Sequence, residues 1–488
     1  MWQLESSSHL PKYQQIMQLI EQKLQQGALQ PGERLPTERG LAIELNVNRS
    51  TVKRAFSELV AHGMITARHG SGYYLSSALS PQMYQPQTNW RHYMQQSQFL
   101  PIEPYFEQLR LQKQTNKQVT DFASGDLPLR LTPHIDLPPL SWPTIIAEEQ
   151  QADPTGYAPL KALIANLFAI RSTQPVKPEQ LLITSGSQQA LYLITQCLLS
   201  PGDAIAVEAP SYLYSLALFK GAGIRIYPLP MAQCHNWQPQ LEALYKKHRI
   251  KMVFVNPMYQ NPTGNILSQQ GREALVKTCS QLHIPIVEDD PYGLLTPEQA
   301  PLYQLAPENV IYIGSLSKTA GSTTRIGWLC APPTVIHRLA TARSEMEFGL
   351  GILPQVMAHH LMSSPTFANH LQTLALTMQE AQQQFQTQLR EQFGNTIAFN
   401  PTQGGYHLWV KQRFCTKPAQ YHRLLQSGVL LMPGTLFGGA ATEARLSVIN
   451  QETSDNAEAV RRLKQAFFAM RASSSAIIEG QETLRDGG

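Results

Sequence analysis

The stretch SLSKTAGSTTRIGW, residues 315–328, places one lysine, Lys318, between short runs of small hydroxylated side chains and sets Arg325 seven positions later. It follows the apolar run VIYIG, residues 310–314, whose length and β-branched content are typical of a buried strand. A lysine amine can act as a nucleophile, while hydroxyls and a guanidinium can bind an anion. The stretch therefore predicts a strand that ends at a reactive amine beside an anion site.

Outward from this stretch, short apolar runs alternate with longer segments of helical periodicity. Strands separated by helices predict a mainly parallel sheet covered on both faces. Polar residues follow the ends of these strands, and ligands bind at that edge in open α/β sheets. The predicted strands are LLITSG, AIAVEAP, IRIYPLP, MVFVNP, IPIVEDD, VIYIGSLSK and RIGWLCAP, and the polar segments are Ser185–Gln188, Pro210–Tyr212, Asn261–Gly264, Asp289–Tyr292 and Ser315–Lys318.

These polar residues match the needs of a phosphorylated pyridine aldehyde. Lys318 supplies the amine for the aldehyde. A carboxylate must keep the ring nitrogen protonated, and Asp289 ends a strand in a suitable place, with its neighbour Asp290 as the competing candidate. Asn261 and Tyr292 can bond the phenolic oxygen of the ring, and Tyr212 can stack on its face.

The phosphate of such a molecule needs amide hydrogens at a helix N-terminus and a cation. The segment SGSQQALYLITQCLL opens a predicted helix with Ser187 and Gln188 in its first turn. Arg325 offers the positive charge, and Ser315 and Ser317 add hydroxyl donors.

In this order, the residues resemble those of fold type I pyridoxal phosphate enzymes of the aspartate aminotransferase superfamily, over about residues 120 to 470. The resemblance implies Lys318 as the cofactor-binding lysine, Asp289 at the pyridine nitrogen, Asn261 and Tyr292 at the phenolic oxygen and Tyr212 against the ring. It also assigns a carboxylate-binding role to Arg445 in ARLSVI. One departure concerns Gln151, which stands before ADPTG where related enzymes often have a tyrosine. The implied phosphate ligands are Ser187, Gln188, Ser315, Ser317 and Arg325.

The first seventy-five residues show a different pattern. Apolar positions at helical spacing predict a helix over 11–26, a short helix around Leu41–Leu45, and a third helix ending at Gly63. The segment MITARHGSGYYL predicts a β-hairpin. Val52, Ala55, Phe56 and Leu59 form the apolar stripe of the third helix, which leaves its basic and hydroxyl residues on other faces.

This region resembles the winged helix-turn-helix domain of the GntR family over nearly its whole length. The resemblance implies that it binds DNA, with contacts in or beside the major groove and, from the wing, near the minor groove. Solvated basic residues on a packing domain are the alternative that the residues alone leave open. The implied contact residues are Arg39, Arg49, Ser50, Thr51, Lys53, His69 and Gly70.

The whole chain is thus expected to be multidomain: a small α+β winged helix-turn-helix over 1–78, a linker over 79–118, a large α/β domain of fold type I over 119–475, and a flexible tail over 476–488. Within the linker we expect a short helix near 105–112. This combination resembles the MocR subfamily of transcriptional regulators. The resemblance implies pyridoxal 5'-phosphate as cofactor, promoter DNA and an amino compound as ligands, and a head-to-tail homodimer. A working aminotransferase with an accessory DNA-binding domain is the alternative, and a regulator that senses the cofactor itself is a third.

Composition limits the cellular setting. The formal charge of +4 over 488 residues is too small to indicate nucleic acid by itself, so a polyanion site must be local. The five cysteines lack CxxC spacing, which argues against a disulfide framework or a zinc site and fits a reducing cytoplasm. With no apolar run approaching eighteen residues, we expect a cytoplasmic protein without a membrane or metal partner.

Overall fold

The computed structural model describes residues 2, 4 and 10–482, except for 26–27, 31, 69, 77–102, 117, 137–138, 172–174, 232–236, 348–349, 416 and 451–455. The chain divides into two compact units, Met1–Leu100 and Pro101–Gly488, called here the head and the body. No helix in these described residues combines the length and the apolar composition needed to cross a bilayer.

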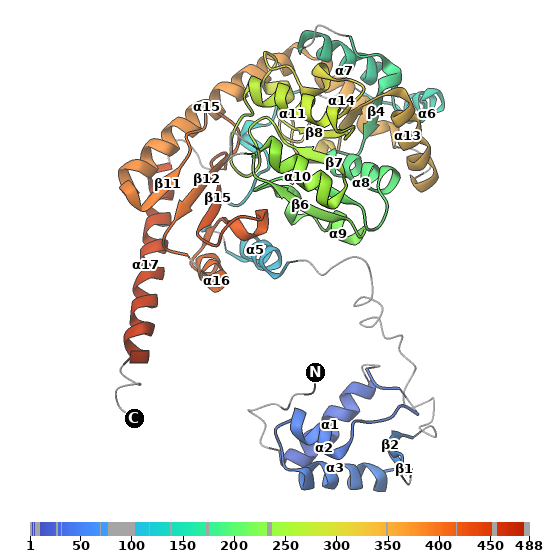
Figure 1. Cartoon of the computed structure of the whole chain (residues 1–488), viewed down its shortest axis with the longest axis vertical. Helices are drawn as coiled ribbons and strands as arrows, with labels where there is room; N and C mark the ends of the chain where they lie inside the picture. Colours follow the sequence, from blue (N-terminus) through green and yellow to red (C-terminus); the bar gives the residue numbers. More distant parts are fainter. Residues whose placement is uncertain are drawn as a thin grey trace. The chain divides into compact units, whose positions relative to one another are not determined.

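The head is a three-helix unit with a two-stranded wing (Figure 1). Thr37 caps the second helix by accepting a hydrogen bond from Gly40 N at 3.1 Å, and Asn48 caps the third by accepting from Ser50 N at 3.0 Å. Ile16 and Ile20 pack with the predicted stripe of the third helix in one core. The fold predicted for this region is therefore confirmed, with α1 Lys12–Gln25, α2 Glu38–Glu44, α3 Arg49–Ala61, β1 Ile65–Arg68 and β2 Gly72–Leu75.

The centre of the body is a seven-stranded sheet in the order β4-β10-β9-β8-β7-β5-β6. All pairs are parallel except those of β10, which runs antiparallel to both β4 and β9. The predicted, mainly parallel sheet is confirmed strand by strand: β4 Leu181–Thr184, β5 Ala204–Glu208, β6 Arg225–Leu229, β7 Ile250–Val255, β8 Ile286–Asp290, β9 Val310–Ser315 and β10 Gly327–Cys330.

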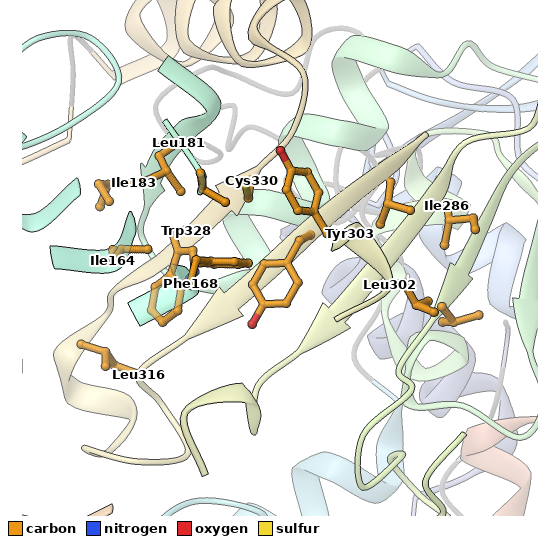
Figure 2. Packing of buried hydrophobic residues seen from close by; sticks show 14 of the residues in the cluster. Ile164, Phe168, Leu181, Ile183, Ile286, Leu302, Tyr303, Leu316, Trp328 and Cys330 are labelled. Atoms are coloured by element: carbon orange, nitrogen blue, oxygen red, sulfur yellow. The ribbon is translucent and has the colours of Figure 1, made fainter. Parts of the chain in front are cut away.

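Helices cover both faces of this sheet because both faces are apolar. One apolar cluster lies under α7 Ala158–Arg171, α10 Gln238–His248, α11 Gln269–Gln281 and α14 Ile352–Ser363. In it, Phe168 meets Tyr312 edge-to-face at 4.8 Å between ring centroids, and Figure 2 shows Phe168 and Trp328 among the packed side chains of this cluster. The opposite face packs against α8 Ser187–Leu198, α9 Ala217–Gly221 and α13 Pro333–Glu347. The remaining helices of this part are α6 Trp142–Gln151 and α12 Leu302–Leu305.

A second part of the body is built on a four-stranded antiparallel sheet in the order β11-β12-β15-β14. Its helices pack around a core of their own, and the long α15 is seen along one side in Figure 1. A short parallel pair, β3 with β13, joins it. The elements are β3 Thr120–Asp121, α15 Pro365–Phe393, β11 Ile397–Phe399, β12 His407–Gln412, α16 Pro418–Gln426, β13 Val429–Leu430, β14 Met432–Pro433, β15 Glu443–Ser447 and α17 Asn456–Glu482.

Two helices lie in ranges assigned to the linker and the tail, and the first of them is close to the short helix expected near 105–112. Helix α5, Pro104–Thr115, lies in the range assigned to the linker, yet Tyr105 is buried in the second core and its hydroxyl donates to Leu431 O at 2.6 Å. The body therefore reaches back to this helix. At the other end, α17 continues to Glu482, into the range expected to be a flexible tail.

Phe168 gives a test of the large core. Replacing it with alanine removes a ring that is 3% exposed and leaves a cavity beside Tyr303 and Tyr312, so we expect the free energy of unfolding of the body to fall by about 3–5 kcal/mol. Leu376→Ala removes a side chain that is 62% exposed and should change it by less than about 0.5 kcal/mol. Urea unfolding followed by circular dichroism measures both, and equal effects would contradict this packing.

Candidate functional site

The predicted body residues come together at the carboxyl edge of the sheet. Tyr212 follows β5, Asn261 follows β7 and Lys318 follows β9, while Asp289 lies near the end of β8. The register places Gly327, at the start of β10, opposite both Thr184 and Ser315. The one antiparallel strand therefore brings the segments after β4 and β9 next to each other.

Lys318 is half-buried at the centre of this edge. Its Nζ donates to Gly125 O and lies 5.5 Å from the ring centroid of Tyr406, whose hydroxyl donates to the carbonyl of Lys318. Burial lowers the pKa of Lys318 to about 8, against the opposing effect of Asp126. A substantial fraction of this amine is therefore neutral, and hence nucleophilic, near physiological pH.

Asp289 is the buried acid of the site. Its Oδ2 accepts a hydrogen bond from the Tyr212 hydroxyl at 2.6 Å, while its Oδ1 has no partner among the described residues. Burial raises the pKa of Asp289 to about 6, although the bond from Tyr212 acts in the opposite direction. A protonated ring nitrogen is the kind of donor that this free oxygen lacks.

Asp290 is not available for that role. Its Oδ2 pairs with Arg171 Nη2 at 2.9 Å and accepts from the Tyr312 hydroxyl at 3.1 Å. Both side chains of the ion pair are almost completely buried, at 0% and 6% exposed. The structure thus favours Asp289 over Asp290 as the acid that faces a ligand.

Arg445 and Asn261 form the other wall. Arg445 Nη1 donates to Asn261 Oδ1 at 3.0 Å and Nη2 donates to Ala123 O at 2.5 Å. Arg445 forms no ion pair with a carboxylate of the described residues, and burial lowers its pKa to about 10. Tyr292 is 1% exposed with a hydroxyl that lacks a partner there, and burial raises its pKa. A buried guanidinium without a carboxylate suits an anionic ligand.

The predicted phosphate ligands lie around Gly327. A Cβ on Gly327 would lie 2.8 Å from the carbonyl carbon of Gly186, so the start of β10 touches the residue that precedes α8. Ser187 and Gln188 lie in the first turn of α8, where backbone amides lack partners within the helix. Ser317 N donates to Ser315 Oγ at 3.1 Å, and Arg325 is exposed with a left-handed backbone. These residues offer amides, hydroxyls and one cation in a small region.

The polar atoms left without partners test whether pyridoxal 5'-phosphate fits. Asp289 Oδ1, Tyr292 Oη and Arg445 Nε are buried and unpartnered within the described residues. Such atoms are costly to bury alone and they belong to three groups that the cofactor and an anionic ligand would engage. The donor set therefore fits this cofactor.

Sequence reasoning missed two residues of the site, His407 and Asn256. His407 on β12 is 1% exposed, and a Cβ on Gly125 would lie 3.2 Å from His407 Nε2 and 3.7 Å from Lys318 Nζ. Burial, together with Arg445 and Lys318, lowers the pKa of His407 far below its usual value, so the ring is neutral. Asn256 ties the site together, since it donates to Asp289 O at 2.7 Å and accepts from Asn261 N at 2.8 Å. An asparagine directly after a strand was the one available signal.

The predicted DNA-contact residues are on the surface of the head. Arg49, Ser50 and Lys53 are exposed along α3, Thr51 is half-buried, and Arg39 is exposed on α2. Gly70 of the wing is exposed with φ at 73°. His69 lies outside the described residues.

Comparison with known proteins assigns both parts to families. Residues 148–463 match the family "Aminotransferase class I and II", and residues 12–75 match "Bacterial regulatory proteins, gntR family". The chain belongs to the aminotransferase class I and II family. It combines that domain with a GntR-type winged helix-turn-helix, as the resemblance to MocR regulators implies.

Relatives of similar length are named as regulators. The chain is 28% identical to the uncharacterized HTH-type transcriptional regulator YdfD of Bacillus subtilis, over 88% of this chain and 90% of that protein. It is 27% identical to the HTH-type transcriptional regulator NorG of Staphylococcus aureus, over 85% and 95%. Among solved structures, LysN of Thermus thermophilus, an α-aminoadipate aminotransferase complexed with N-(5'-phosphopyridoxyl)-L-leucine, is 26% identical with a TM-score of 0.64, over 76% of this chain and 98% of LysN.

The two adjacent aspartates should differ in their effect on the apo protein. Asp290→Asn leaves the Arg171 guanidinium buried without its counter-ion, so we expect a loss of about 3–5 kcal/mol in the free energy of unfolding. Asp289→Asn breaks no ion pair of the described residues and should cost far less. Chemical denaturation at neutral pH measures both, and an equally large loss for Asp289→Asn would contradict the assignment.

The pH dependence of Asp289→Asn follows from the raised pKa. Since the folded protein holds the Asp289 proton up to about pH 6, and the unfolded chain only to about 3.8, wild-type apo protein loses stability as pH rises between these values. The substitution removes that loss. The stability of the variant relative to wild type should therefore be more favourable at pH 7.5 than at pH 5.

Proposed function

We propose that this protein is a cytoplasmic, pyridoxal phosphate-dependent transcriptional regulator. Its head binds promoter DNA, and its body senses an amino compound. The observation that carries the proposal is the coexistence of two sets of residues in one chain: the exposed basic face of α3, and the cluster of Lys318, Asp289 and Arg445 at the edge of the sheet. Full-length relatives named as regulators support this reading.

The residues of the edge would divide the work of holding the cofactor. When bound, pyridoxal 5'-phosphate supplies an aldehyde carbon that bonds reversibly to primary amines and a ring that withdraws electrons. Lys318 would provide the resident amine, Asp289 would bind the ring nitrogen, Asn261 and Tyr292 would bond the phenolic oxygen, and Tyr212 would pack against the ring. The phosphate would be held by Ser187, Gln188, Ser315, Ser317 and Arg325.

Arg445 would select the ligand class. The guanidinium has no carboxylate partner among the described residues and is anchored by Asn261 and Ala123 O, so it is oriented to receive a carboxylate. An amino compound with a carboxylate could then engage Arg445 and compete with the amine of Lys318. Release of Lys318 changes the charge in a buried site. Effector binding can therefore shift the protein between two arrangements that differ in their affinity for the effector, and the coupling free energy in such cases is typically about 1–3 kcal/mol.

A homodimer is part of the proposal. Large apolar side chains are exposed on the body, including Leu129 at 86%, Trp142 at 68% and Ile146 at 42%. A second copy that covers them would remove this unfavourable exposure. By resemblance we expect the head-to-tail arrangement of MocR regulators, with Gln151 standing where a partner-reaching tyrosine is common.

An active aminotransferase is the second candidate. It is supported by the 26% identity to LysN and by the half-buried amine of Lys318, since such a lysine can also move a proton. Steady-state formation of keto acid at about 1 per second or faster would favour catalysis as the main function. A reaction that stops after a single turnover would favour sensing.

The proposal is tested by Lys318→Ala. We expect this variant to lose the visible absorbance of bound pyridoxal phosphate and its covalent capture by borohydride, while the fold persists. Electrophoretic mobility shifts on the upstream region of the gene, with and without a panel of amino acids, should then show DNA binding that no longer responds to amino compounds. An unchanged response would refute sensing through Lys318, and a response of wild type to pyridoxal phosphate alone would favour the cofactor as the signal.

The pKa of Lys318 sets the pH dependence of cofactor capture. Only the neutral amine attacks an aldehyde, and burial lowers the pKa of Lys318 to about 8. The rate of pyridoxal phosphate uptake should therefore rise from pH 6.5 and level off above about pH 8, as followed by absorbance in a stopped-flow instrument. A rise that continues to pH 10 would indicate an ordinary exposed lysine.

A further inference from the structure

An acidic side chain of the head holds one of the proposed DNA-contact residues. Both Nε and Nη2 of Arg49, the first residue of α3, lie 3.0 Å from Glu38 Oε2. The Arg49 side chain is nevertheless 70% exposed, whereas that of Glu38 is only 13% exposed. The pair is therefore a mostly buried carboxylate that restrains an arginine at the surface.

The second oxygen of Glu38 is fixed by the wing. The Tyr73 hydroxyl on β2 donates to Glu38 Oε1 at 3.2 Å, and the Tyr73 ring packs edge-to-face against Phe56 of α3 at 4.8 Å between centroids. Glu38 itself begins α2 directly after the capping residue Thr37. One carboxylate thus connects α2, α3 and the wing.

This arrangement decides which edge of the guanidinium remains open. Arginine has five N–H donors in a planar fork. The side edge, formed by Nε and Nη2, is directed at Glu38, which leaves the end edge of Nη1 and Nη2 for another partner. Two parallel donors are the pattern that reads the O6 and N7 atoms of guanine in the major groove.

A free arginine would have to lose side-chain entropy on binding, and a contact by Glu38 lowers that cost because the side chain is already restrained. Coulomb repulsion between Glu38 and DNA phosphates acts in the opposite direction for every sequence equally. The two effects are therefore separable: restraint changes the preference for one base pair, and charge changes the affinity for all DNA.

We infer that Glu38 is a positioning residue for DNA recognition: it holds Arg49 with its end edge toward one base pair, and so sets the preference at that pair. The inference rests on the proposed DNA-binding function. It adds Glu38, which does not touch the bases, and it specifies which edge of Arg49 faces them.

The test is selection from a library of randomised DNA duplexes by the full-length protein. Wild type that selects no motif would refute DNA recognition itself, a different failure from that of the inference. Arg49→Ala identifies the base pair that Arg49 reads, because preference is lost there. Glu38→Ala should then reduce preference by about fivefold at that same base pair and leave the other positions of the motif unchanged.

Glu44→Ala is the matched control, since it removes the same charge from the other end of α2 without touching Arg49. It should leave the preference at every position as in wild type. Retained preference in Glu38→Ala would overturn the inference, because Arg49 would then read its base pair without Glu38. An even loss across the motif, or an equal effect of Glu44→Ala, would also overturn it, because a general charge effect or loss of structure would explain the result.

Tyr73→Phe provides a second variant in case Glu38→Ala does not fold. It keeps the ring packing on Phe56 and the charge of Glu38 but removes the hydrogen bond to Oε1. A smaller loss of preference at the same base pair is expected. If Glu38→Ala is unfolded by thermal denaturation and Tyr73→Phe retains full preference, the inference fails.

Discussion

The alternation of side chains along β8 decides how this body can bind a ligand. Successive residues of a strand point to opposite faces, so Asp289 and Asp290 cannot serve the same environment. Asp290 is committed to Arg171 and Tyr312 on one face. Asp289 accepts a hydrogen bond from Tyr212 on the other and forms no ion pair among the described residues. Because β8 lies in the interior of the sheet, with β7 and β9 paired on either side, this division is rigid.

The electrostatics of the site follow from the same burial. Lys318 and Arg445 are both cationic groups whose pKa values are lowered chiefly by removal from water, and His407 beside them is neutral. A site with this charge balance binds an anion more readily than a cation. The buried charge of Arg445 is not neutralised within the described residues, because the guanidinium donates to the oxygens of Asn261 and Ala123 and to no carboxylate. The body is therefore suited to a ligand that brings the missing negative charge.

The sequence was most informative where patterns are local. The apolar runs predicted every strand of the main sheet, and strand ends identified Lys318, Asp289 and Asn261 because polar residues there meet at one edge. The residue pattern alone left Asp290 open as a competitor of Asp289, which only the resemblance assigned, since that choice depends on strand orientation and on Arg171, a residue distant in the chain. The place of His407 was likewise not predictable, because it depends on packing against Gly125, far away in the chain. Glu38 and Arg49 are only eleven positions apart, but their contact depends on how two consecutive helices pack, which the sequence pattern does not give. The helical character of residues 104–115 was only partly visible, as its burial depends on the second core.

Strand β10 has a consequence for cofactor choice. Because β10 runs antiparallel to β9, the chain leaves the sheet after Ser315 and returns at Gly327, so Lys318 and Arg325 lie on one continuous loop. If the cofactor binds as proposed, the distance between the Lys318 amine and Arg325 on this loop would select ligands whose electrophilic carbon and anionic end have a matching separation. A shorter or longer molecule with the same two groups would reach Lys318 or Arg325 but not both.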